Sequence, residues 1–164
     1  MTTPAPAPAP LEYRFTDDAK IAILQARNEA LHLRADAVAP AHLALGVIHT
    51  QSAARLALLF PDPGNLEMLC RALGGSREPA PLIPEDITYL DAARDALDGA
   101  TLEAARLDPA GDTHPIHILL GLFHPWDQAA NHAVEPDAVA LTLAATGLGD
   151  SRLRTLLPAL TARS

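Results

Sequence analysis

The chain has 164 residues, enough for one domain or two small ones; it is 49% apolar but only 4% aromatic, a composition that favours helices built on alanine and leucine. Its net charge of −8 would repel the phosphates of nucleic acid, and no apolar run approaches the roughly 18 residues that cross a bilayer. Neither nucleic acid nor a membrane is therefore an expected partner. With a single cysteine and no secretory signal at the N-terminus, the expected location is the cytoplasm.

The N-terminal segment predicts an arm followed by a long helix. Residues 4–10 alternate proline and alanine, a pattern typical of polyproline II, so we expect a disordered arm at 1–12 before a single folded domain at 13–162. Thr16 is a good N-cap, and apolar residues then recur at helical spacing as far as Leu33.

Three further helices are expected before a Gly/Pro-rich stretch. Pro40 opens a short segment that is apolar on all sides and so is predicted to be buried. Helices at 52–60 and 64–73 follow, separated by turn residues. We therefore place the first repeat at 14–74 and a linker at 75–84.

The second half, 85–162, repeats the order of the first. The sequence Glu-Ala-x-x-Leu ends at Leu33 and, 74 residues later, at Leu107. The sequence His-x-x-Leu-Gly begins at His42 and again at His117, 75 residues later, so one residue is inserted in the loop between the motifs. Two last helices are expected at 136–145 and 150–160. The pattern predicts an all-α fold of two tandem four-helix repeats related by pseudo-two-fold symmetry.

Acidic residues are expected at helix starts, where a carboxylate complements the helix dipole. The residues given this interpretation are Asp17, Asp18, Glu85, Asp86 and Asp91. Cys70 lies among leucines at helical spacing, so a buried apolar role is predicted for it.

A helix beginning Phe-Thr-x-x-Ala, then Glu-Ala-x-x-Leu, a loop and His-x-x-Leu-Gly, with the order repeated in the second half, resembles the N-terminal domain of Clp unfoldases. The resemblance covers about residues 14–160. It implies a domain that receives substrates and adaptors. Because no phosphate-binding G-x-x-x-x-G-K-[ST] motif occurs, we expect a free-standing version of the domain without the ATPase modules.

The sequence departs from that family where some members bind phosphorylated arginine. In those members a glutamate precedes the histidine of each repeat, but here Ala41 and Ile116 hold these positions. The threonine near the start of each repeat is present as Thr16 and replaced by Leu90 in the second repeat. Neither Ala41 nor Ile116 offers a carboxylate to a guanidinium group, so phosphoarginine recognition of that kind is not expected.

Histidines invite two other interpretations. We assign structural roles to His42 and His117, with Gly46 and Gly121 of the same motif, because a histidine at a helix start finds backbone partners. A metal site would need ligands at a familiar spacing. The remaining histidines of the second half, His114, His124 and His132, do not provide one, so no metal or other cofactor is predicted.

The sequence favours a non-enzymatic module that binds a protein or peptide where the two repeats meet. Its partners would be Clp unfoldase components, adaptors or substrates, and the chain, expected to be a monomer, would act as an adaptor or decoy in regulated proteolysis. The candidate contact residues are Phe15, Thr16, Tyr89, Leu90 and Trp126. A small helical DNA-binding regulator and an uncharacterised hydrolase are the alternatives, with the charge opposing the first and the absence of a nucleophile motif opposing the second.

Overall fold

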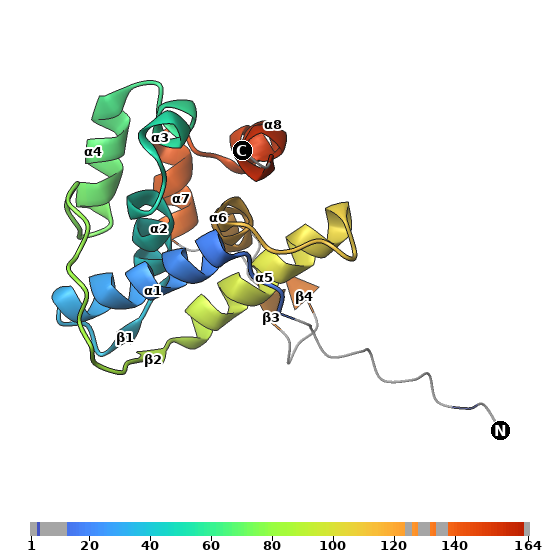
Figure 1. Ribbon diagram of the computed structural model, residues 1–164, viewed down its shortest axis with the longest axis horizontal. Coiled ribbons are helices and arrows are strands. Elements are labelled where there is room, and N and C mark those ends of the chain that lie inside the picture. Colours follow the sequence, from blue (N-terminus) through green and yellow to red (C-terminus); the bar gives the residue numbers. More distant parts are fainter. Residues whose placement is uncertain (1–2, 4–12, 124–125, 128–131, 134–137, 163–164) are drawn as a thin grey trace.

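A computed structural model describes residues 3, 13–123, 126–127, 132–133 and 138–162. The predicted arm at 1–12 lies outside these residues apart from Thr3. The elements of the first half (Figure 1) are α1 (Asp17–His32), β1 (Ala37–Val38), α2 (Pro40–His49), α3 (Ala53–Leu59) and α4 (Pro63–Ala72). Those of the second half are β2 (Thr88–Tyr89), α5 (Asp91–Leu107), α6 (Pro115–Phe123), β3 (Trp126–Asp127), β4 (His132–Ala133), α7 (Ala138–Ala145) and α8 (Asp150–Thr161). The predicted all-α fold is confirmed in these ranges.

Local capping explains where the helices of the first half begin. The Thr16 hydroxyl oxygen accepts a hydrogen bond from the backbone N–H of Ala19 at 3.1 Å, as a good N-cap does. Ser52 caps α3 in the same way, and the Asp62 carboxylate caps α4. Each cap satisfies a backbone donor that the first helical turn leaves without a partner.

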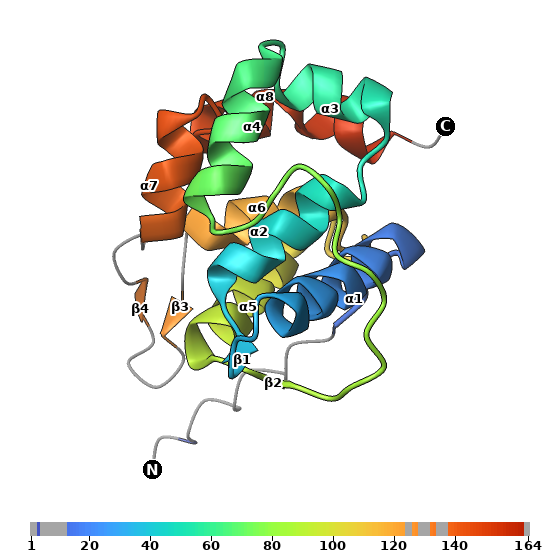
Figure 2. The ribbon, with the colours of Figure 1, turned by 90° about the vertical axis from the view of Figure 1, so that its left-hand side faces the viewer.

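The helices form three layers around the two apolar segments. Figure 2 shows α2 and α6 lying between the pair α1 and α5 and the four helices α3, α4, α7 and α8. Nearly every residue of α2 and α6 is buried, as expected for helices that are apolar on all sides. Cys70 is also buried in the core, as the sequence predicts.

Two glycines allow the layers to approach each other closely. A Cβ atom on Gly46 would lie 2.3 Å from the carbonyl oxygen of Ala22 in α1. A Cβ atom on Gly121 would lie 2.1 Å from the carbonyl oxygen of Ala96 in α5. The backbone of each central helix therefore touches the backbone of its outer partner, and only glycine fits at the contact.

Equivalent contacts in the two halves show the internal symmetry. β1 pairs in parallel with β2, so that Val38 lies opposite Tyr89. The same pairing occurs between Phe15 and Thr113, again in parallel. Each repeat thus pairs the residues before its first helix with those before the second helix of the other repeat, as a pseudo-two-fold arrangement requires. We call the Phe15–Thr113 pairing the first junction and β1–β2 the second junction.

Two of the acidic residues are not at a helix start. Asp17, Asp18 and Asp91 lie in the first turns of α1 and α5. Glu85 and Asp86 precede β2, and α5 begins only at Asp91, so the capping interpretation is wrong for these two. Among the described residues, no helix is both long and apolar enough to cross a membrane.

Candidate functional site

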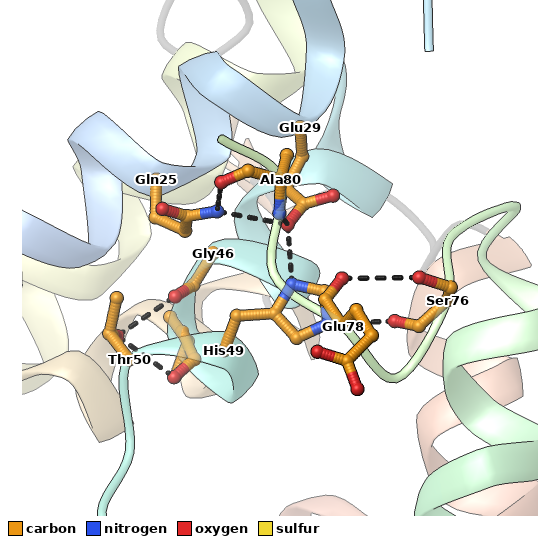
Figure 3. A network of polar contacts seen from close by, with 9 residues as sticks. Gln25, Glu29, Gly46, His49, Thr50, Ser76, Glu78 and Ala80 are labelled. Carbon is orange, nitrogen blue, oxygen red and sulfur yellow. Dashed lines mark hydrogen bonds and ion pairs between the residues drawn. The ribbon is translucent and has the colours of Figure 1, made fainter. Parts of the chain in front are cut away.

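A buried ion pair holds the linker against the first repeat (Figure 3). Glu29 of α1 and His49 at the end of α2 meet at 2.5 Å between Oε1 and Nδ1, with side chains only 3% and 2% exposed. The other ring nitrogen of His49 contacts the carbonyl oxygen of Ser76 at 2.8 Å. The backbone N–H of Ala80 donates to Glu29 at 2.9 Å, so the linker is bonded to both members of the pair.

The pKa values of both groups favour the charged pair. Burial acts to lower the pKa of His49, but hydrogen bonds with Cys70 and Glu29, and the negative charge of Glu29, raise it to about 10. Burial acts to raise the pKa of Glu29, and the hydrogen bonds from His49, Ala80 and Gln25 outweigh it, so the pKa lies below its ordinary value. The pair is therefore ionised at neutral pH.

The linker continues over α1 towards β2, as Figure 2 shows. Gln25 donates to the carbonyl oxygen of Ala80 at 3.0 Å, and the Asn28 side chain accepts from the backbone N–H of Ile83 at 3.3 Å. Asn28, a polar residue, is buried in this contact. The linker is thus a strap that brings residues 86–88 beside the end of α1.

A hollow lies where this strap meets the end of α1. It is lined by Leu31, Ala35, Asp36, Asp86, Ile87 and Thr88. Its walls come from the last turn of α1, the loop before β1, and the strap with β2. None of these residues is expected at a site from the sequence, since the two segments lie about fifty positions apart and only the strap joins them.

The first junction carries two of the predicted contact residues. The Phe15 ring stacks on the exposed Tyr13 ring with their centroids 6.0 Å apart. The Tyr13 hydroxyl donates to the Asp98 carboxylate, and this bond, together with burial, raises the Tyr13 pKa to about 12. Thr16 caps α1 with its hydroxyl group, so part of its hydrogen-bonding capacity is already used.

The second junction carries two more. Tyr89 is half-buried, and Leu90, which precedes α5, is 47% exposed without a side-chain cap. Burial raises the pKa of Tyr89, and the positive charge of Arg27 on α1 opposes this rise. Phe15 precedes α1 whereas Tyr89 lies beyond its end, so about 24 Å of helix separates the two junctions. The structure does not bring the four predicted residues into one cluster.

Trp126, the fifth predicted contact residue, lies in β3, where it pairs with Ala133 of β4. β3 lies against α5. The Trp126 side chain is outside the described part of the structure, and so is His124. The role assigned to Trp126 stays a prediction.

The two motif histidines hold equivalent positions at the starts of α2 and α6. Nδ1 of His42 accepts a hydrogen bond from the backbone N–H of Ala39 at 2.9 Å, and Nδ1 of His117 accepts from that of His114 at 2.9 Å. An accepting nitrogen carries no proton, so both rings are neutral. Burial lowers the pKa of both groups, and the His114 charge helps to bring that of His117 to about 4. Within the described residues, no group of three possible metal ligands is present.

Replacing His117 with asparagine should reduce the sensitivity of the domain to acid. The pKa of His117 is about 4 in the folded protein, whereas its ordinary value is 6.5. The contribution of this histidine to the free energy of unfolding is therefore complete above pH 6.5 and is lost as the pH falls towards 4. Between about pH 6.5 and pH 4.5, we expect the free energy of unfolding to fall by about 2 kcal/mol more in wild type than in His117→Asn. The Asn side-chain oxygen also accepts the hydrogen bond from the His114 backbone, but it does not bind a proton. Urea unfolding at both pH values measures this, and equal losses would contradict it.

The residues that precede the two motif histidines lie at the starts of α2 and α6. Ile116 is buried at the start of α6, and Ala41 is half-buried at the equivalent position of α2. Neither side chain carries a hydrogen-bonding group. These positions therefore offer no carboxylate to a cationic ligand.

Known structures share this architecture. The fold is that of the Clp and Hsp104 N-terminal domains. The Hsp104 N-terminal domain from Candida albicans is 21% identical, with a TM-score of 0.64 over 92% of this chain and 93% of that chain. The N-terminal domain of the caseinolytic-protease-associated chaperone ClpD from Arabidopsis thaliana is 20% identical, with a TM-score of 0.55 over 88% of this chain and 97% of that one.

A third similar structure comes from work on a malarial protein secretion system. It is 17% identical, with a TM-score of 0.65 over 89% of this chain and 93% of that one. No protein-family model matches the chain, and no curated protein matches it either. At these identities, the likeness establishes the Clp-type fold.

Proposed function

We propose that this chain is a non-catalytic protein-binding module that acts as an adaptor or decoy in regulated proteolysis. Its partners would be peptides, adaptors or components of a Clp-type unfoldase. The similarity to N-terminal domains of ClpD and Hsp104 supports this class of function. Binding would occur along the layer formed by α1 and α5, with the two junctions at its ends.

The exchange of strand pairing between the repeats carries the proposal. Tyr13 lies just before the first junction and Leu90 just after the second, so the pairing of the repeats places them near opposite ends of α1. They are 54% and 47% exposed, although both are large apolar residues. Exposed apolar anchors at fixed positions are what a protein interface uses, with polar residues at its rim. A span of about 24 Å accommodates roughly seven residues of an extended peptide.

Leu90→Ser tests this proposal. We expect the substitution to weaken the binding of reduced, carboxymethylated α-lactalbumin, which is permanently unfolded, about fivefold, because a partly buried leucine contact contributes about 1 kcal/mol. Serine is a preferred N-cap and Leu90 precedes α5 without a cap, so the variant should fold at least as well as wild type. Fluorescence anisotropy of the labelled unfolded protein measures the affinity.

Leu141→Ser is the matched control. Leu141 is a leucine on α7, in the layer opposite α1 and α5, and it is 65% exposed. We expect this variant to bind as wild type does. Equal weakening by both substitutions would show that the contact is unspecific, and no binding by wild type would refute the proposed function.

A further inference from the structure

The hollow beside the second junction combines an apolar floor with an acidic rim. It measures about 480 Å³, and its apolar side chains are Leu31, Ala35 and Ile87. The carboxylates at its edge belong to Asp36 and Asp86, which are exposed. A site of this composition suits a side chain with a hydrocarbon stem and a charged end.

The carboxylates are available to a ligand. Neither Asp36 nor Asp86 forms a hydrogen bond or ion pair with any other described residue. The hollow also lies at the C-terminal end of α1, where the helix dipole adds negative potential. Arg34, the basic residue that follows α1, is not among the residues that line the hollow. The two carboxylates and the end of α1 therefore favour a cation in the hollow.

We infer that this hollow binds a lysine or arginine side chain of the partner peptide, with its methylene groups on Leu31, Ala35 and Ile87 and its charged group between Asp36 and Asp86. The inference rests on the proposed function and adds the chemical class of one recognised residue. Charge complementarity selects this occupant, because an acidic side chain would be repelled and a purely apolar one would gain nothing from the two carboxylates.

The strap is fixed at both ends, so the walls of the hollow are held in place. The bonds of Ala80 to Glu29 and of Ile83 to Asn28 fix the strap on α1 just before Asp86. The pairing of Thr88 with Ala37 then fixes its other end. Both walls are therefore held before a ligand arrives, which reduces the ordering that binding would require.

The whole-chain charge acts in the same direction. With a net charge of −8, the protein attracts a basic peptide over distances comparable to the Debye length. The hollow beside Tyr89 and Leu90 would then anchor one cationic residue while the junction holds its apolar neighbour. A peptide with a basic residue next to a leucine is the expected ligand.

The test compares two peptides that differ in one charge. The probes are the acetylated, amidated pentapeptide Gly-Leu-Arg-Leu-Gly and the same peptide with citrulline, a neutral isostere, in place of arginine. Binding to the full chain is followed by amide chemical shifts in NMR titrations at about 20 mM and about 200 mM salt. We expect shifts at Leu31, Ala35 and Ile87, about fivefold weaker binding of the citrulline peptide, and weaker binding of the arginine peptide at the higher salt.

A pair of double variants assigns the effect to the two carboxylates. Asp36→Asn with Asp86→Asn should reduce the affinity for the arginine peptide to that for the citrulline peptide. The control, Glu67→Gln with Glu78→Gln, removes the same charge from exposed residues outside the hollow and should keep most of the wild-type affinity. All four residues are exposed, so folding should persist in both variants, and the NMR spectra show whether it does.

Equal binding of the two peptides, or an equal loss in both double variants, would overturn the inference. So would shifts that do not include the lining of the hollow. The proposed function would survive these results if Leu90→Ser still weakened the binding of the unfolded protein. If neither the pentapeptides nor the unfolded protein bound, both proposals would fail together.

Discussion

Replacing Gly121 with alanine is expected to lower the free energy of unfolding by about 3 kcal/mol. The new Cβ would lie 2.1 Å from the Ala96 carbonyl oxygen and 2.7 Å from the Ala100 backbone nitrogen. Both are backbone atoms of α5, so no side-chain rotation relieves the clash and α5 must move away from α6. Urea unfolding followed by circular dichroism measures the change.

Gly46→Ala should have an effect of similar size, because its Cβ would meet backbone atoms of α1 in the same way. Gly149→Ala is the control: there the nearest atom to a new Cβ is that of Ala144 at 3.9 Å, an ordinary contact. We expect its cost to stay below about 1 kcal/mol, due mainly to the poorer cap that alanine provides for α8. If Gly121→Ala were as stable as Gly149→Ala, close contact between the helix backbones would not be essential to the fold.

These glycines also show why the fold could be predicted from the sequence. Gly46 and Gly121 end the same short motif in the two halves, and each meets the alanines of the preceding long helix. The recurrence of this motif predicts two copies of one helical unit, whereas the close contact between the helix backbones is seen only in the structure. Periodicity and capping residues such as Thr16 then placed the helix ends to within a few residues.

The hollow and the strap could not be predicted in this way. Asp86 follows a Gly/Pro-rich linker and precedes a helix by only a few residues, a position that favours a capping interpretation. Its actual place beside Asp36 depends on hydrogen bonds from the linker backbone to Glu29 and Asn28. Every residue except proline has the same backbone N–H donor, so the residue types of a linker do not predict these bonds. The burial of Glu29 could not be predicted either, although a glutamate recurs at the equivalent position of the second repeat, Glu103.

Replacing Glu29 with alanine is expected to lower the free energy of unfolding by about 3 kcal/mol or more at pH 7. The substitution leaves the His49 side chain, only 2% exposed, without its carboxylate, and removes the acceptor of Ala80. Breaking one member of a buried ion pair costs about 3–5 kcal/mol, since the remaining charge is uncompensated. The strap should also loosen, so faster amide hydrogen exchange at Ala80 is expected beside the urea unfolding measurement.

The same pair should make stability fall in mildly alkaline solution. The His49 pKa is about 10 in the folded protein and 6.5 by its ordinary value, so the folded state holds an extra proton between these limits. The contribution of the protonated His49 to the free energy of unfolding is complete below pH 6.5 and is lost as the pH rises through about 10. The free energy of unfolding changes by about 1.4 kcal/mol per pH unit for one proton, so in wild type it should fall by about 3 kcal/mol between about pH 7 and pH 9.5. In His49→Gln it should fall much less.

The second repeat supplies a matched comparison for this titration. Glu103, equivalent to Glu29, binds Arg154 of α8 through two hydrogen bonds of 3.0 Å. Hydrogen bonds with Glu103 and Asp150 hold the pKa of Arg154 above its already high ordinary value, so Arg154 keeps its charge in this range. A double-mutant cycle should therefore give a coupling energy for Glu29 and His49 that declines from pH 7 to pH 9.5 and a constant one for Glu103 and Arg154. A constant coupling at both sites would show that His49 is not charged in the folded protein, because only the loss of a proton makes the first pair depend on pH.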